Sequence, residues 1–344
     1  MNGSETLPVD DIASVRRLSP TLARAFGFAA DLVRKSPAFA GALAFFVAMM
    51  TAFIILSPEV FLRPEPYTAV FVSLPILIIM AVPSTFVIAA GEIDLSFPSV
   101  VGVTALVFAT AAAGGVNPFA ALVLAILAGL GAGVVNGILV TMIGLPSLVA
   151  TLGMYFLLRG VVNMVTQGLP TELPSLQGSF FSRLLIGEIG TIPVQMFWGG
   201  GFAILGILLF TKHRFGAHVR ATGDNELTTR EMGVDVRWVR TRTFMYVGLA
   251  AGIVGVLEVL INNTFWPTVG DDLLLLVLAS VFVGGTPTRG GVGSVAGAVV
   301  GAFSVGFLEE GLVASGLSGF YTQFFYGLLI VLSLTAHSLR RKRT

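Results

Sequence analysis

The sequence predicts an all-α integral membrane protein with about ten transmembrane helices. Hydrophobic residues make up 55% of the 344 residues and charged residues only 11%, whereas a soluble domain has roughly 25% charged residues. The mean hydropathy is +0.90. Apolar runs of about 20 residues, the length needed to cross a bilayer, recur along the chain. One long polar segment, residues 212–242, interrupts them and indicates a water-exposed loop between two groups of helices.

Ten apolar runs are candidate membrane spans. They lie near residues 39–57, 69–91, 98–114, 118–142, 147–166, 193–211, 243–261, 272–285, 292–309 and 319–337. The third and eighth runs are short. Each adjoins a glycine-rich or proline-containing polar stretch, GEIDLSFP from Gly91 and GGTPTRGG from Gly284. Each stretch is expected to be either a tight cytosolic turn or a re-entrant break inside the membrane.

The domain organisation follows from these runs. We expect a single transmembrane domain at 39–337, which contains the loop 212–242, between an N-terminal tail (1–38) and a basic C-terminal tail (338–344). The charged lead is longer than that of a secretory signal and the first apolar run is long enough to span, so an uncleaved first helix is predicted. Residues 21–33 fit either an interfacial amphipathic helix or a loosely ordered tail.

The distribution of Lys and Arg predicts the orientation. Basic residues gather before the first span, in 212–242, at Arg289 and at the end of the chain. By the positive-inside tendency, both termini and the central loop are expected in the cytoplasm, which an even number of spans allows. Acidic residues collect on the opposite side: Glu59, Glu65, Glu172, Glu188, Asp271 and Asp272.

The central loop has mixed charge. Seven Lys or Arg residues are interleaved with Asp224, Glu226, Glu231 and Asp235. A lipid-binding patch would be almost purely basic, so this mixture around a short helix-compatible stretch (225–232) favours a docking surface for a protein. A solvated connector is the alternative.

Glycines at every fourth position predict close helix packing. One set lies in the fourth span and one in the ninth: Gly129, Gly133, Gly137, Gly293, Gly297 and Gly301. Such spacing lets another backbone approach closely, which matters because lipid offers no hydrophobic drive for helix association. Residues 99–102 (SVVG) and 294–297 (SVAG) also resemble each other. Together the echoes suggest a duplicated fold of the transporter kind, although chance could produce them.

No catalytic or metal-binding pattern is present, so an enzyme is not expected. The sequence contains no phosphate-binding loop, no Ser/His/Asp set and no Cys. We therefore expect no cofactor in this chain. Candidate residues for a translocation pathway are charged or neutral polar groups in or beside spans: Glu92, Asp94, Asn136, Thr151 and Asn163. The alternative role of the neutral ones is to hydrogen-bond between helices, and that of Asp94 is to cap the third helix.

Four stretches, in the same order, resemble the permease subunits of bacterial ABC importers of the ribose/xylose/arabinose type, which are related more distantly to branched-chain amino-acid permeases. They are GEIDLSFPSVVG (91–102), NGILVTMIGLPSLVATLGMYFLLRGV (136–161), FGAHVRATGDNELTTREMGVDV (215–236) and SVFVGGTPTRGGVGSVAGAVVGA (280–302). The resemblance covers most of residues 70–335.

The resemblance implies an ABC importer permease in the bacterial inner membrane. It also implies partners: two ATPase subunits that bind ATP and Mg, a periplasmic binding protein that delivers the solute, and a second permease copy, with a homodimer expected. No nucleic-acid partner is expected. The coupling segment that receives the ATPases would include Gly223, Asp224, Asn225, Glu226, Thr229 and Gly233.

Three residues in two motifs depart from the family pattern. Thr228 and Thr229 stand where the family has small paired alanines, which puts the tightness of the ATPase contact in doubt. Glu92 stands where its motif has a second glycine, which suggests a subgroup with a different solute. Without an ATP site of its own, the chain would use ATP only by being moved through the loop.

The expected cargo is a small neutral solute, a monosaccharide or a related polyol. A permease for branched-chain amino acids is one alternative. An ion-coupled secondary sugar transporter is another, and it would need an ionisable residue near the midplane, which GEIDLS supplies only if it is re-entrant.

Overall fold

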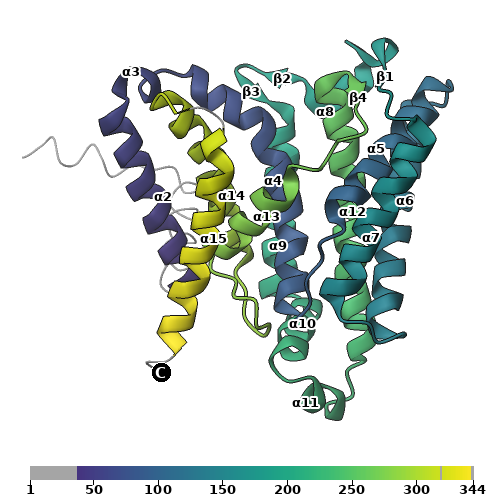
Figure 1. The fold of residues 1–344 in the computed structure, drawn as a ribbon, viewed down its shortest axis with the longest axis vertical. Coiled ribbons are helices and arrows are strands. Elements are labelled where there is room, and N and C mark those ends of the chain that lie inside the picture. The colour runs from purple at the N-terminus through teal and green to yellow at the C-terminus, as the bar shows by residue number, and fades with distance from the viewer. Residues whose placement is uncertain (1–36, 318–319, 342–344) are drawn as a thin grey trace, which may run out of the picture.

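The structure, a computed structural model, describes residues 37–317 and 320–341, which are built mainly of helices (Figure 1). Most of the expected N-terminal tail, with its possible interfacial helix at 21–33, lies outside the described residues. So do the last three residues of the basic C-terminal tail. The helix α15 continues through the first part of that tail to Arg341.

Within the described ranges, the predicted membrane protein of about ten spans is confirmed. Seven helices are long and apolar enough to cross a membrane, and three further apolar helices are shorter. The helices that match the ten apolar runs are α2 (Pro37–Leu56), α4 (Glu65–Ala89), α5 (Phe97–Ala113), α6 (Pro118–Thr141), α7 (Ser147–Thr166), α9 (Val194–Thr211), α12 (Val236–Asn262), α13 (Leu273–Val283), α14 (Val295–Ala314) and α15 (Phe320–Arg341).

The two ends of the helical bundle differ. At the upper end in Figure 1, here the ribbon end, lie two antiparallel two-residue pairs and three short helical pieces. These are β1 (Thr171–Glu172) with β4 (Thr264–Phe265), β2 (Glu188–Ile189) with β3 (Ile192–Pro193), α3 (Pro58–Phe61), the 3₁₀ turn Pro174–Leu176 and α8 (Phe180–Ile186). These small ribbons are the exception to an all-α fold.

The opposite end, here the loop end, carries the polar segment. It folds into α10 (Arg214–Asp224) and α11 (Glu226–Glu231), and together residues 212–235 are called the hairpin. The C-terminal end of the described chain lies at this same end in Figure 1. The hairpin and the C-terminal end lie on the same side, which agrees with an even number of spans between them. That this side faces the cytoplasm stays a prediction.

The core of the bundle is formed by α4 and α12. Side chains of α4 from Leu74 to Ala90 are buried almost without interruption, although Pro75 and Pro83 lie inside the helix. The helices α6, α7 and α9 instead leave large apolar side chains exposed, as membrane-facing helices do. The interior is therefore apolar, as in a soluble protein, and the outer helices also present apolar side chains at the surface.

Glycines bring two pairs of helices into backbone contact. A Cβ added at Gly133 would lie 2.5 Å from the carbonyl oxygen of Phe244 and 2.7 Å from Cα of Met245, both on α12. Gly129 and Gly137 meet the same helix, at Gly248 and Thr241. The contact between α6 and α12 is therefore too close to admit side chains at these positions.

The second glycine set seals α14 against α13. A Cβ at Gly297 would overlap the carbonyl oxygen of Gly284, and one at Gly301 would overlap that of Ser280. Gly293 lies before the helix, next to Phe210, Ala89 and Thr85. The two sets thus pack against different partners, and the proposed internal duplication stays a prediction.

The helix chain is broken twice at the loop end. After α4, the chain turns at Gly91 (φ of 87°), and residues 92–96 are not helical. This stretch runs beside the first turns of α7, with the amide of Ile93 donating to Ser147 (3.1 Å) and that of Leu95 to Thr151 (3.0 Å). Because an α-helix rises 1.5 Å per residue, α5 starts roughly one helical turn inside the bundle. GEIDLS is therefore an inserted, unwound segment rather than a surface turn. The second break, residues 284–294, joins α13 to α14.

Candidate functional site

The hairpin is fastened to the bundle by an aromatic cluster. Phe215 of α10 stacks on Phe86 of α4, with ring centroids 5.7 Å apart, and Phe86 meets Phe210 of α9 edge-on at 5.0 Å. The guanidinium of Arg220 lies 5.0 Å from the Phe210 ring centroid and donates to the Phe210 carbonyl. Burial lowers the pKa of Arg220 from its usual value, but a guanidinium stays charged. These contacts fix α10 across the loop end.

The second helix of the hairpin has defined ends. Asn225 caps α11 by accepting from the amide of Thr228 (3.1 Å). Past its other end, Gly233 has φ of 78°, a left-handed conformation that glycine adopts without steric cost. A capped helix of six residues is thus held between two turns.

A junction of four glycines joins the hairpin to both breaks. A Cβ at Gly223 would overlap the Ala89 carbonyl oxygen and lie 2.5 Å from the amide nitrogen of Gly291. A Cβ at Gly290 would lie 2.8 Å from both the Gly223 carbonyl oxygen and Cα of Gly91. The amide of Gly291 also donates to the Ala89 carbonyl (2.9 Å). The end of α10 therefore touches both interrupted stretches of the membrane domain, backbone against backbone.

Arg240, on the first turns of α12, adds an ionic connection. Its Nε lies 2.9 Å from a carboxylate oxygen of Glu92, and its Nη2 lies 2.9 Å from one of Glu226. Glu226 also pairs with Arg230, one turn along α11. A chain of charges thus runs from the hairpin to the break 91–96.

The predicted coupling residues divide between two faces of α11. Thr229 is buried, its hydroxyl donating to the Asn225 carbonyl (2.8 Å), and Glu226 is turned toward Arg240. Leu227 and Met232 are 73% and 63% exposed. The outer face therefore presents Leu227 and Met232 among polar and charged side chains, whereas Glu226 contacts the permease chain itself.

Three of the proposed pathway residues meet around the break 91–96. The Oδ1 atom of Asp94 accepts from both the amide (2.8 Å) and the hydroxyl (2.7 Å) of Ser96 at the start of α5. The amide of Asn136 donates to that hydroxyl (2.7 Å), while Asn136 Oδ1 has no hydrogen-bond partner among the described residues. Thr151 accepts the Leu95 amide.

The other two pathway residues lie apart from this group. Glu92 is held by Arg240 at the rim of the break. Asn163 is exposed near the end of α7, away from the interior of this chain. Asp94 is buried, but the segment runs only about one helical turn along α7 from the loop end, which does not place a carboxylate at the midplane as an ion-coupled carrier requires. The hydrogen bonds of Asp94 to Ser96 are those of a group that fixes a helix start.

Two arginines connect segments in ways that sequence reasoning missed. Arg159, within α7, donates to the carbonyls of Pro267 and Val269 and pairs with Asp271 in the loop before α13. Arg240 was counted only as one of the loop's positive charges. For Arg159, the sequence offered one signal: a charged side chain inside a span is energetically costly and therefore requires a partner.

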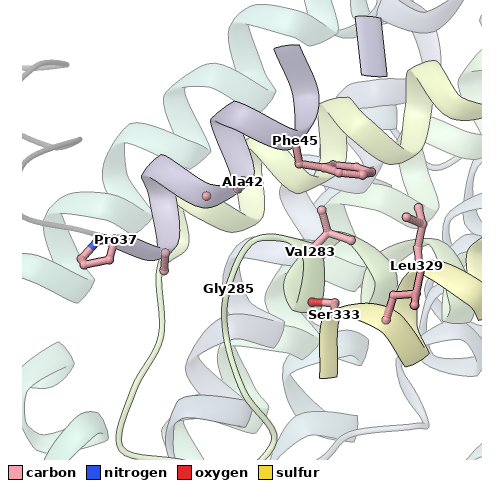
Figure 2. Close-up of a pocket in the computed structure, with 10 residues that line it drawn as sticks. Pro37, Ala42, Phe45, Val283, Gly285, Leu329 and Ser333 are labelled. Atoms are coloured by element: carbon pink, nitrogen blue, oxygen red, sulfur yellow. The ribbon is translucent and has the colours of Figure 1, made fainter. Parts of the chain in front are cut away.

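The cavities of the described residues differ in the polarity of their lining. An apolar pocket of about 330 Å³ lies between α2, the end of α13 and α15, where Figure 2 shows Phe45, Val283 and Leu329 around it. The hydroxyl of its one polar side chain, Ser333, donates to the Phe282 carbonyl (2.6 Å). A cavity of about 350 Å³ lies beside the hairpin, between Glu92, the turn 144–147 and Arg240. No group of three potential metal ligands occurs in the part of the chain that the structure describes.

Comparison with known proteins gives one family. Residues 66–334 match the family described as "Branched-chain amino acid transport system / permease component". The ribose import permease protein RbsC of Escherichia coli K12 is 33% identical over 258 residues, which cover 74% of this chain and 80% of that protein. The autoinducer 2 import system permease protein LsrC of Yersinia pestis is 31% identical over 294 residues, 83% and 81% of the two chains. No solved structure matches.

Proposed function

This chain belongs to the permease-component family of branched-chain amino acid transport systems, and from that premise we propose that it imports a monosaccharide or a related polyol. As a member of that family it is a multi-pass permease subunit of an ABC importer, and it works with ATPase subunits and a solute-binding protein. ATP and Mg belong to the ATPase partner.

The choice of solute rests on two kinds of support. The similar proteins are named for import of ribose and of autoinducer 2, and neither is named for an amino acid. In addition, the break 91–96 is surrounded by the neutral groups of Ser96, Asn136 and Thr151. Neutral hydrogen-bonding groups suit a solute with hydroxyls, and we propose the unpaired Asn136 Oδ1 as an acceptor for one of them.

We propose that the hairpin receives the force of the ATPases. The observation that carries this is the glycine junction, because Gly223 touches both Ala89 and Gly291 and so links the hairpin to both breaks. Leu227 and Met232 would contact the ATPase, since they are the large apolar side chains exposed on and next to α11. A displacement of the hairpin would then be transmitted to segments that have no helical hydrogen bonds to resist it.

A homodimer is part of the same proposal. Asn163 lies exposed among apolar neighbours on α7, where Met164 and Val165 are 66% and 63% exposed. A side-chain amide facing lipid would have no partner for its hydrogen bonds. A second copy that covers this face would supply one.

The test is reconstitution of this chain in proteoliposomes with the ATPase and binding protein encoded beside it. We expect uptake of a pentose or another small sugar that requires ATP and is abolished by omitting the ATPase. Uptake of leucine instead of sugar would favour the amino-acid alternative. Uptake driven by a proton or sodium gradient without the ATPase would refute the importer assignment.

A matched pair of variants tests the docking face. Leu227→Asp is expected to reduce recovery of the ATPase with the purified permease at least about tenfold, because a charge would be buried in an apolar contact. Leu62→Asp is the control, since Leu62 is equally exposed (74%, against 73% for Leu227) but lies at the ribbon end. Equal ATPase recovery with both variants would contradict the docking role.

A further inference from the structure

Glu92 gives this chain a connection that a glycine could not make. The motif that GEIDLS resembles has glycine at this position, and the structure shows what the carboxylate does. Its side chain is only 11% exposed, and it lies at the start of the inserted segment 91–96. An ionised carboxylate that is withdrawn from water in this way needs a cationic partner. That partner is Arg240.

Arg240 is shaped to hold two carboxylates at once. Its Nε lies 2.9 Å from a carboxylate oxygen of Glu92 and its Nη2 lies 2.9 Å from one of Glu226. The Nε–H makes no hydrogen bond within the described part of the chain, so the contact with Glu92 is an ion pair set by distance and charge. The Arg240 side chain is 20% exposed, so its ion pairs are screened less than those at an open surface. Three separate elements thus meet at one cation: the break 91–96, the first turns of α12 and the helix α11.

The two ion pairs of Arg240, here the bridge, connect the hairpin to the break 91–96 as the glycine junction does, but through a different type of interaction. At the junction, Gly223 and Gly290 only touch neighbouring backbone, a contact that resists compression. The ion pairs of Arg240 are attractive, so they also resist separation. Movement of α11 away from the bundle would therefore pull the break 91–96 in the same direction through Arg240.

We propose that Arg240 is a positioning residue that ties α11 to the break 91–96 through Glu226 and Glu92, so that displacement of the hairpin in either direction moves the inserted segment. The inference rests on the proposed importer function and adds a residue pair to it. Loss of the bridge leaves ATP hydrolysis possible but reduces the solute moved for each ATP.

The test measures solute uptake and ATP hydrolysis together in the reconstituted complex. Glu92→Gln and Arg240→Met are each expected to lower the uptake per ATP about tenfold while the ATPase rate stays within about twofold. The charge-reversed double variant Glu92→Arg with Arg240→Glu is expected not to restore the ratio, because its new carboxylate at position 240 would face Glu226 and the connection to α11 stays broken. Arg240→Lys, which carries the charge without the fork, is expected to fall between.

Arg237→Gln is the matched control. Arg237 is one turn away on α12, lines the same cavity beside the hairpin and makes no ion pair among the described residues. Its variant should keep the uptake per ATP of the unmodified protein. Glu92 is buried and so cannot act through contact with the ATPase, which separates this role from docking.

Each outcome decides one claim. An unchanged ratio in both single variants, with normal uptake by the unmodified complex, would overturn the bridge and leave the importer function intact. So would recovery of the ratio in the charge-reversed double variant, because that variant leaves α11 unconnected to position 240. If the unmodified complex shows no ATP-driven uptake, the proposed function fails, and the bridge inference fails with it.

Discussion

Replacing Gly133 by alanine tests the close contact of α6 and α12. The added Cβ would lie 2.5 Å from the Phe244 carbonyl oxygen and 2.7 Å from Cα of Met245. Non-bonded carbon atoms prefer separations of about 3.5 Å or more, so the two helices have to move apart by roughly 1 Å. Both obstacles are backbone atoms, which cannot rotate away as a side chain would.

Gly131→Ala is the matched control for this substitution. Gly131 lies on the same helix two residues earlier, and a Cβ there would meet nothing within 4 Å. Both variants gain the same helix propensity, about 1 kcal/mol for Gly to Ala, so the difference between them isolates the packing cost. Overpacking of this kind costs about 1–3 kcal/mol.

The assay compares the midpoint temperature of thermal unfolding of the two purified variants in detergent. We expect Gly131→Ala to match or exceed the unmodified protein and Gly133→Ala to unfold several degrees lower, since 1 kcal/mol shifts the midpoint of a 150–250-residue domain by about 2–4 °C. Gly133→Leu should prevent recovery of a monodisperse protein, whereas Gly131→Leu should not. Equal midpoints for the two alanine variants would refute the backbone contact.

Three further predictions concern single contacts. Arg159→Met is expected to destabilise the protein by about 1–3 kcal/mol, because the loop carbonyls and Asp271 lose their donor; Asp271→Asn should cost less, since Arg159 keeps the carbonyls, and the two midpoint temperatures are compared. Thr151→Val leaves the buried amide of Leu95 without an acceptor and should lower the midpoint, whereas Thr151→Ser should not; equal loss in both would contradict the role of the hydroxyl. Gly233→Ala and Gly233→Trp should weaken ATPase binding to a similar degree, up to about tenfold. The cost comes from the left-handed backbone conformation (φ of 78°), because a Cβ at Gly233 would meet nothing within 4 Å. A much larger loss for Trp alone would show that the size of the side chain matters there.

The spans of this protein could be predicted from sequence because length and hydrophobicity almost suffice in a bilayer. The run predicted at 147–166 coincides with α7, and those at 118–142 and 193–211 match α6 and α9 to within a residue. The boundary at the polar loop is less sharp. The stretch 212–242 includes the first turns of α12, since that helix begins at Val236 and its charged residues extend beyond the apolar run.

Only part of the candidate site was predictable, since the glycine contact faces follow from spacing while the connections made by Arg159 and Arg240 were missed. The coupling and pathway roles stay predictions. Glycine spacing pointed to Gly129, Gly133 and Gly137 as a contact face, yet nothing in the pattern could say that α12 is the neighbour. The short length of the third run indicated a break without deciding whether it is inserted. That depends on hydrogen bonds from Ile93 to Ser147, more than fifty residues away. Long-range pairing of this kind, like that of Glu92 with Arg240, leaves no periodic signal in one sequence.

The glycine seams also determine how the bundle can deform. Since α6 and α12 meet without intervening side chains, as do α13 and α14, each pair behaves as a rigid body. Gly91, Gly223 and Gly290 lie outside both pairs, after α4, at the end of α10 and in the break after α13, where backbone meets backbone. Opening toward one face of the membrane is therefore expected as a movement of whole helix pairs, with little sliding within either pair.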